Sequence, residues 1–331
     1  MKALVYTDTL KVQYRDEPDP VPGPDEALVK IEAVGICGSD MHAYHGHDSR
    51  RVPPLILGHE AVGVVQNGAQ KDRHVVLNPL MTCGICDHCQ GGRSNLCAKR
   101  ELIGMRLAGA FAQYITIPER NLLDMPQDMD PVIASLAEPA ATSLHAIYLA
   151  EKVLHRPLSE SRALILGGGS IGAFAALMLK HKGCLEICLG DTNPLRRQTA
   201  ERLECCTVFD PVGADLPEEN GFDLVIDAVG SGRTRAASCR FVRSGGVISH
   251  VGLQDNEPGL DTRRMTLEEI TFLGNDHIVV GIQFVSSQEP ALGVVFPNRS
   301  GLAGPGLPGL SRGRTNLRDD KIRSHLGKGV D

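Results

Sequence analysis

The sequence lacks any hydrophobic run that approaches the roughly 18 residues a membrane-spanning helix needs. Its opening residues, MKALVYTD, lack the basic segment followed by an apolar segment that marks a secretory signal. It also lacks an excess of positive charge, because its net charge is −6 and its pI is near 6.1. These absences argue against membrane and nucleic-acid partners. We therefore expect a cytoplasmic protein that acts on a small molecule.

Ten cysteines occur in 331 residues, and without an export signal they are poor candidates for disulfides. Four of them follow the pattern C-x2-C-x2-C-x7-C, at Cys83, Cys86, Cys89 and Cys97. The last gap is longer than in a bacterial ferredoxin motif, and three overlapping sulfurs do not fit a thioredoxin motif. Four thiolates on one loop predict a closed, structural zinc site, which leaves no metal position open for a substrate.

A glycine-rich turn marks the second half of the chain. Residues 163–166, ALIL, predict a short buried strand, GGGSIG follows at 167–172, and an apolar helix is predicted over 173–180. This is G-x-G-x-x-G between a strand and a helix, where the helix N-terminus binds the pyrophosphate of a dinucleotide. The predicted cofactor-binding residues of this turn are Gly167, Gly169, Ile171 and Gly172.

The residues after the next predicted strand bear on the choice of cofactor. Asp191 ends that strand, nineteen residues after Gly172. A carboxylate there binds the ribose hydroxyls and repels a 2′-phosphate, which favours NAD over NADP. Arg196 and Arg197 act in the opposite direction, because a guanidinium accommodates that phosphate. We expect NAD, with Arg196 beside it.

The two halves of the chain have different patterns. Over 146–275, helices alternate with short apolar strands, which predicts a doubly wound parallel sheet. Its further predicted elements are a helix over 194–204, strands over 185–190, 206–209 and 222–227, a helix that ends at 242 and a strand over 246–251. Residues 1–145 instead hold short β-like runs, such as 27–31 and 61–65, broken by proline and glycine.

Two further motifs come early in the chain, GICGSDMH with Cys37 and GHEAVG with His59. Either residue alone is weak support for a metal site. Together with the four-cysteine loop and the glycine-rich turn, in this order, they resemble the zinc-dependent medium-chain dehydrogenase/reductase family. Residues 138–142, EPAAT, are similar to the polyol branch, which includes sorbitol, galactitol-phosphate and idonate dehydrogenases. The resemblance covers residues 1–275.

The resemblance implies a GroES-like catalytic domain over 1–145, a Rossmann domain over 146–275, and two zinc ions per chain. The catalytic zinc would be held by Cys37, His59 and Glu138, with one position open. Glu60 would sit beside the zinc-bound water and approach the metal when ligands exchange. Asp40 would accept the second N–H of His59 and fix its tautomer.

The same resemblance implies the reaction. Zinc would bind a secondary hydroxyl of a polyol or sugar alcohol, or of its phosphate, and lower its pKa. A hydride would pass to NAD in the cleft between the two domains and leave a ketone. Ser39 would accept the hydroxyl proton and His42 would pass it outward. His45 and His47 are interpreted as surface residues. Members of the family are commonly homodimers or homotetramers.

Two segments depart from the family pattern. Residues 66–74 are fewer than in many relatives and are interpreted as a trimmed surface loop. Residues 276–331 are rich in glycine, proline and arginine, which is typical of disordered chain, and they do not match the family. Either a shifted reading frame or a divergent tail explains them. Two alternatives therefore stay open: a threonine-type or simple alcohol dehydrogenase, and an NAD- and zinc-binding protein that its ending has inactivated.

Overall fold

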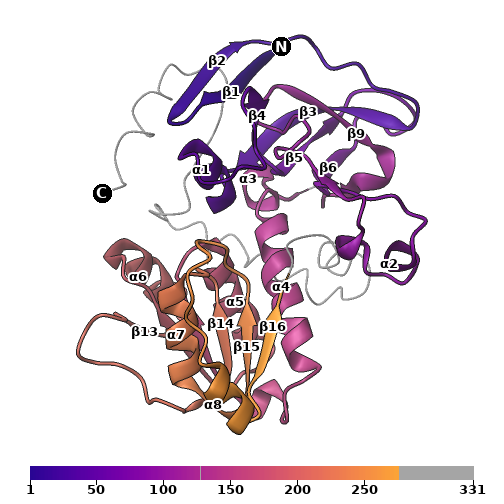
Figure 1. Cartoon of the computed structure of the whole chain (residues 1–331). Helices are drawn as coiled ribbons and strands as arrows, with labels where there is room; N and C mark the ends of the chain where they lie inside the picture. The colour runs from indigo at the N-terminus through magenta and orange to yellow at the C-terminus, as the bar shows by residue number, and fades with distance from the viewer. Residues whose placement is uncertain (127, 276–331) are drawn as a thin grey trace. The chain divides into compact units, whose positions relative to one another are not determined.

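The computed structural model describes residues 1–126 and 128–275 of the chain (Figure 1). The expectations about residues 276–331 lie outside the described residues. The chain forms two compact units, of which the first comprises Met1–Glu138 and the second begins at Pro139. The division falls inside one helix, α4 (Ala137–Glu151), whose first two residues belong to the first unit.

The first unit contains three sheets. A five-stranded antiparallel sheet has the order β10–β6–β5–β3–β9, a three-stranded sheet has the order β2–β1–β4, and β7 pairs with β8. The strands are β1 (Lys2–Asp8), β2 (Lys11–Asp16), β3 (Glu26–Gly35), β4 (Leu55–Ile56), β5 (Glu60–Val65), β6 (His74–Leu77), β7 (Leu80–Met81), β8 (Glu101–Leu102), β9 (Tyr114–Pro118) and β10 (Leu122–Asp124).

Alternating side chains build the core of this unit. In β3 the apolar Ala27 and Val29 are buried while Lys30 between Val29 and Ile31 is exposed, because successive residues of a strand face opposite sides. Ala27 and Val29 join Val65 and Leu77 in one buried cluster. The helices of this unit are short: α1 (Gly38–Tyr44), α2 (Asp87–Gln90) and α3 (Pro131–Ala134), with single 3-10 turns at Ser94–Leu96 and Glu119–Asn121.

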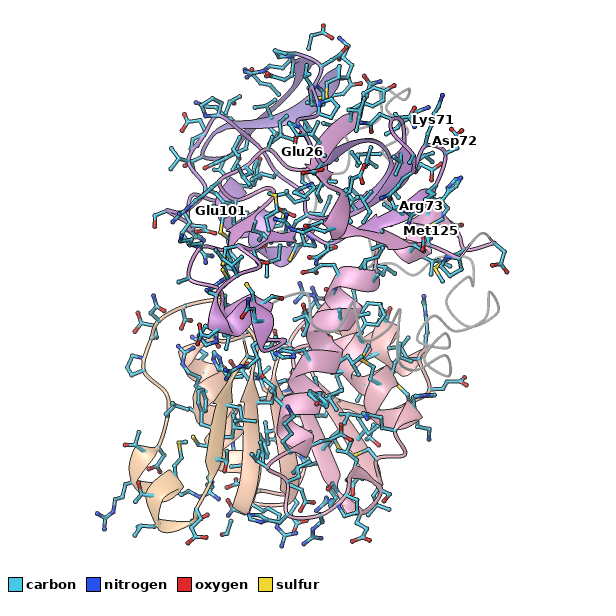
Figure 2. All side chains as sticks on the ribbon, turned by 90° about the vertical axis from the view of Figure 1, so that its right-hand side faces the viewer. Glu26, Lys71, Asp72, Arg73, Glu101 and Met125 are labelled. Carbon is cyan, nitrogen blue, oxygen red and sulfur yellow. The ribbon has the colours of Figure 1, made fainter. Side chains whose placement is uncertain are left out.

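The loop between β5 and β6 confirms the predicted surface loop. The Val65 N–H bonds the Arg73 carbonyl and the Asp72 N–H bonds the Val65 carbonyl, so a compact turn joins the two strands. Lys71 and Asp72 are exposed, and Figure 2 shows both side chains at the outer edge of the view. The short loop therefore joins β5 to β6, and both strands remain in the five-stranded sheet.

The second unit is a six-stranded parallel sheet with the order β13–β12–β11–β14–β15–β16. Figure 1 shows β14, β15 and β16 side by side. The strands are β11 (Arg162–Leu166), β12 (Glu186–Gly190), β13 (Thr207–Phe209), β14 (Phe222–Asp227), β15 (Val242–His250) and β16 (Thr271–Gly274). From β11 the strand order runs outward in one direction through β12 to β13 and in the other through β14 to β16. This change of order between the parallel strands β11 and β14 is the switch point where Rossmann folds bind dinucleotides. The predicted doubly wound sheet is confirmed.

The helices of this unit are α5 (Ser170–His181), α6 (Pro194–Glu201), α7 (Gly232–Phe241) and α8 (Thr262–Leu267), with a 3-10 turn at Leu158–Glu160. Three predicted boundaries of this unit were wrong by three residues or more. Helix α5 begins at Ser170 and not at the predicted residue 173, because Gly169 is already its N-cap residue. Helix α6 ends three residues before the predicted end, because the N–H groups of Leu203 and Glu204 bond carbonyls three residues back and Glu204 has a φ of 51°. Strand β15 starts at Val242, before the predicted Gly246, because Val242 already pairs with Phe222.

The chain has one described stretch, Pro131–Glu151, with the length and the mean hydropathy, 1.2, of a membrane span. Of its most apolar window, 61% is buried inside the protein. Ala146, Ile147 and Ala150 of this stretch are 1% exposed or less. A core helix gives this pattern, because its apolar side chains are covered by the protein itself.

Candidate functional site

The four cysteines of the loop converge on one point. The Sγ–Sγ distances are 3.5 Å for Cys86–Cys89, 3.5 Å for Cys97–Cys83 and 3.9 Å for Cys83–Cys89. A tetrahedral zinc with Zn–S bonds of about 2.3 Å separates its sulfurs by about 3.8 Å, so the spacing fits that ion. Backbone N–H groups of Ile85 and Cys86 bond the Cys83 sulfur and lower the pKa of that thiol to about 6. A thiolate, the form that binds zinc, is thereby favoured at Cys83.

Local structure explains this convergence. Cys86 is the N-cap residue of α2, Cys89 lies in that helix, and Cys97 follows the 3-10 turn at Ser94–Leu96. Strands β7 and β8 pair at the base of the loop, with Leu80 opposite Leu102. The loop thus has its two ends joined and its sulfurs turned inward, which is the arrangement of a structural metal site.

A second candidate metal site comprises Cys37, His59 and Glu60, whose ligand atoms all lie within 4.8 Å of one another. Strand register brings them together. Gly35 at the end of β3 pairs with Glu60 at the start of β5. Cys37 follows β3 as the N-cap residue of α1, and His59 directly precedes β5. Residues 23 positions apart in the sequence therefore meet at one end of the sheet.

Burial and like charge dominate the electrostatics of this site. His59 is 2% exposed, and Glu60 and Glu138 are each 4% exposed. Burial raises the pKa of Glu60, and the nearby carboxylate of Glu138 raises it further. Burial likewise raises the pKa values of Glu138 and Cys37. Acids that resist ionisation when no cation is near become ligands when one is present. The thiol, imidazole and carboxylate donors fit zinc.

The Asp40 carboxylate lies beside His59 and accepts hydrogen bonds from backbone N–H groups on both sides of the site. Its Oδ2 accepts the Cys37 N–H at 3.0 Å, and its Oδ1 accepts the Gly58 N–H at 3.3 Å. The His59 Nδ1 lies 3.6 Å from Oδ1 of Asp40 and has no hydrogen-bond partner, so the expected hydrogen bond from His59 to Asp40 is not formed in this structure. Burial alone lowers the pKa of His59, but Asp40 and Cys37 raise it well above its usual value. Because Nδ1 faces Asp40, Nε2 is the nitrogen available to a metal.

The two predicted relay residues lie on α1. Ser39 is in its first turn and His42 is three residues later, so both share one face of the helix. Burial lowers the pKa of His42, and His47 and His45 lower it further. The ring centroids of His42 and His47 are 6.4 Å apart, so His47 packs beside the predicted relay residue. A further contact was not predicted from the sequence: Arg51 donates from Nη2 to the Ser39 Oγ at 3.0 Å.

The glycine-rich turn of the second unit has the geometry its motif requires. Gly167 has a φ of 102°, which favours glycine, and a Cβ on Gly172 would lie 1.8 Å from the Gly167 carbonyl oxygen. Gly169 is the N-cap residue of α5, and a Cβ on it would meet no protein atom within 4 Å. That open space beside a helix N-terminus fits a bound pyrophosphate. The Ile171 carbonyl accepts from Ser143 Oγ, which holds α5 against α4.

Asp191 lies at the end of β12, directly beside this turn. Its Oδ2 accepts the Gly168 N–H and its Oδ1 accepts the Asn193 N–H, each at 2.7 Å. Arg196 Nη1 lies 3.7 Å from Asp191 Oδ2, and 56% of the Arg196 side chain is exposed. Arg197 instead bonds the Asp191 carbonyl and pairs with Asp210. Of the two arginines, Arg196 is therefore the one with an accessible guanidinium.

Comparison with known proteins agrees with both units. The family model for the alcohol dehydrogenase GroES-like domain matches residues 23–127, and the model for the zinc-binding dehydrogenase matches residues 170–279. L-galactonate-5-dehydrogenase of Escherichia coli (strain K12) is 34% identical over 290 residues and covers 83% of each chain. L-threonine 3-dehydrogenase of Xanthomonas oryzae pv. oryzae (strain MAFF 311018) is 32% identical, covering 83% of this chain and 84% of its own.

A solved structure adds to these relatives. The crystal structure of a zinc-binding dehydrogenase from Sinorhizobium meliloti 1021 bound to NADP has a TM-score of 0.74 and 31% sequence identity. It covers 89% of this chain and 87% of that chain. The predicted resemblance is confirmed by the two family models together with relatives above 30% identity. The chain belongs to the zinc-binding, alcohol-dehydrogenase-like family of oxidoreductases.

Proposed function

We propose that this protein oxidises a secondary hydroxyl of a polyol or sugar alcohol, free or phosphorylated, to a ketone and passes the hydride to NAD. The observation that carries the proposal is the cluster of half-buried Cys37 with buried His59 and Glu60, with the Glu138 carboxylate near it. These donors serve a catalytic zinc, whereas the four cysteines of the loop serve a structural one.

Different residues of the first unit would bind the zinc, orient its ligands and transfer the proton. Zinc, when bound, supplies Lewis acidity that makes the substrate hydroxyl easier to deprotonate. Asp40, whose Oδ1 lies 3.6 Å from His59 Nδ1, would attract that nitrogen and leave Nε2 for the metal. Ser39 accepts the proton of the substrate hydroxyl, and His42, with its lowered pKa, carries a proton to solvent. Glu60 and Glu138 are buried, so little water screens their carboxylates. The interaction of these carboxylates with a bound cation is therefore stronger than it would be at the surface.

Asp191 supports NAD as the preferred cofactor. Its carboxylate is 5% exposed and is fixed by two backbone N–H groups, so it cannot turn away from an incoming 2′-phosphate. Arg196 supports NADP as a secondary substrate, because its guanidinium is exposed beside Asp191. We therefore expect kcat/KM to be higher for NAD than for NADP, and the reverse order would contradict the role given to Asp191.

A threonine-type dehydrogenase is the second candidate function. The observation in its favour is that a relative at 32% identity is an L-threonine 3-dehydrogenase. A direct comparison of substrates distinguishes an amino acid from a polyol. Sorbitol, galactitol and its 1-phosphate, L-galactonate, L-idonate and L-threonine form a suitable panel. Turnover of threonine alone would reject the polyol proposal.

The test that comes first is the zinc content of purified, chelator-washed protein and of Cys37→Ser. We expect about two zinc ions per chain in the wild type and about one in the variant, together with loss of turnover. Cys184→Ser is the matched control, because Cys184 is buried in the second unit and should leave both values unchanged. One zinc per chain in both proteins, with no turnover, would instead support an inactivated dehydrogenase. Light scattering on the same samples would test the expected dimer or tetramer.

A further inference from the structure

Arg51 is buried, and each of the three nitrogens of its guanidinium has a hydrogen-bond partner. Its side chain is 0% exposed. Its Nε donates to the Gly104 carbonyl at 2.9 Å, its Nη1 pairs with Asp48, and its Nη2 donates to the Ser39 Oγ at 3.0 Å. An arginine stays charged in proteins, and burying a charge is costly unless it is paired. The chain therefore holds a permanent cation directly against the predicted proton acceptor.

The contact determines what the Ser39 hydroxyl can do. A guanidinium has donors and no acceptor, so the Ser39 oxygen must accept from it. The serine hydrogen then points elsewhere, and a second lone pair stays available. A relay needs one proton to give and one lone pair to receive with, and this arrangement leaves both. The nearby positive charge also stabilises negative charge that develops on Oγ during transfer.

We infer that Arg51 is a positioning residue for proton release, and that it acts through Ser39. This inference rests on the proposed function. The substrate hydroxyl proton passes to the Ser39 Oγ while the Ser39 proton passes to His42, and from there to water. The electron pair of the substrate C–H bond leaves with the hydride to the oxidised nicotinamide. The serine ends as it began, and one proton is released for each hydride transferred.

A purely architectural role is the competing explanation. Arg51 ties the segment before β4 to Gly104, so its loss could loosen that segment without any effect on protons. Arg50 offers a matched control. It binds the same Asp48 carboxylate, with Nε to Oδ1 at 2.8 Å and Nη2 to Oδ2 at 3.0 Å, but 53% of its side chain is exposed. Arg50 also donates its backbone N–H to Asp48, whereas it is Arg51 that donates to Ser39.

The test is a double-mutant cycle on the zinc-loaded enzyme. Arg51→Met should lower kcat about 10-fold to 100-fold, with the substrate KM changed less than about twofold. On the Ser39→Ala background the same substitution should have no further effect, because the residue through which it acts is gone. Arg51→Lys, which keeps the charge, should recover part of kcat, and Arg50→Met should match the wild type. Additive losses, or equal kcat values for Arg50→Met and Arg51→Met, would overturn the inference.

A second measurement does not depend on turnover. The charged and titratable groups that act on His42 are His45, His47, Asp48 and Arg51. Removing the Arg51 cation should therefore raise the His42 pKa followed by NMR, while Arg50→Met should leave it in place. An unchanged pKa in a folded Arg51→Met protein would count against the inference. If Ser39→Ala retained full kcat, the proposed relay itself would fail, whereas a slow Ser39→Ala with a fast Arg51→Met would reject only the role of Arg51.

Discussion

Gly35→Ala should damage catalysis without replacing any group that contacts a metal or a substrate. Gly35 lies at the end of β3, opposite Glu60 of β5. A Cβ on Gly35 would lie 2.1 Å from the Glu60 Oε2, 3.1 Å from its Cβ and 3.2 Å from its Cδ. Ordinary contacts begin near 3.4 Å, so the Glu60 carboxylate must move by about 1 Å. A shift of that size in a catalytic group can lower the rate by about 100-fold.

The assay is steady-state oxidation of the substrate with zinc content measured on the same preparation. We expect kcat about 100-fold below the wild type, with the zinc of the cysteine loop retained. Gly38→Ala is the control for metal content and stability, because a Cβ on Gly38 would meet no protein atom within 4 Å. A Gly35→Ala enzyme with kcat within about twofold of the wild type would refute the reasoning, since Glu60 would then be free to move or irrelevant to turnover.

The remaining predictions concern the structural zinc, the cofactor and acid stability. Cys97→Ser should lose about one zinc per chain and expose the loop to limited proteolysis, while cofactor binding, measured by fluorescence titration, should persist. Arg196→Ala should lower kcat/KM for NADP about 10-fold and leave that for NAD within about twofold; equal losses for both would assign Arg196 to the pyrophosphate. Although burial opposes it, hydrogen bonds from Arg50 lower the pKa of Asp48 from 3.8 to about 2, so its stabilisation is present above pH 3.8 and is lost as pH falls towards 2. The Tm gap between wild type and Asp48→Asn should therefore shrink over that interval, and a constant gap would show that the charge of Asp48 is immaterial.

Much of the fold could be predicted because its local patterns agree with its long-range pairing. Strand β14 has the predicted bounds, Phe222–Asp227, since every one of its residues is buried and the apolar Phe222 and Leu224–Ile226 are typical of a central parallel strand. The glycine-rich turn was recognisable because Gly172 has no space for a side chain. The end of α6 was not predictable from pattern alone, because the turn at Glu204 depends on a left-handed backbone at a non-glycine residue.

The site was predictable only in part, because some of its residues belong to no motif and are placed by contacts with distant segments. Cys37 and His59 stand in motifs whose spacing reflects metal chemistry, and strand register then brings them together. Arg51 belongs to no motif, and the pair Arg50-Arg51 looks like two surface charges in the sequence. One of the two is exposed and the other is fully buried, a difference that arises from the partners Gly104 and Ser39 contributed by distant segments. Periodicity carries no information about such partners.

The cysteine loop, residues 83–97, can unfold locally while the rest of the chain stays folded. Its ends are clasped by the pairing of β7 with β8, and within it only Cys97 and Asn95 are buried. Fifteen residues with so little apolar cover depend on their metal for order. Zinc starvation or oxidation of the thiols would therefore open this loop first, while the five-stranded sheet and the parallel sheet stay folded. The loop would then report the metal and redox state of its surroundings before the rest of the protein responds.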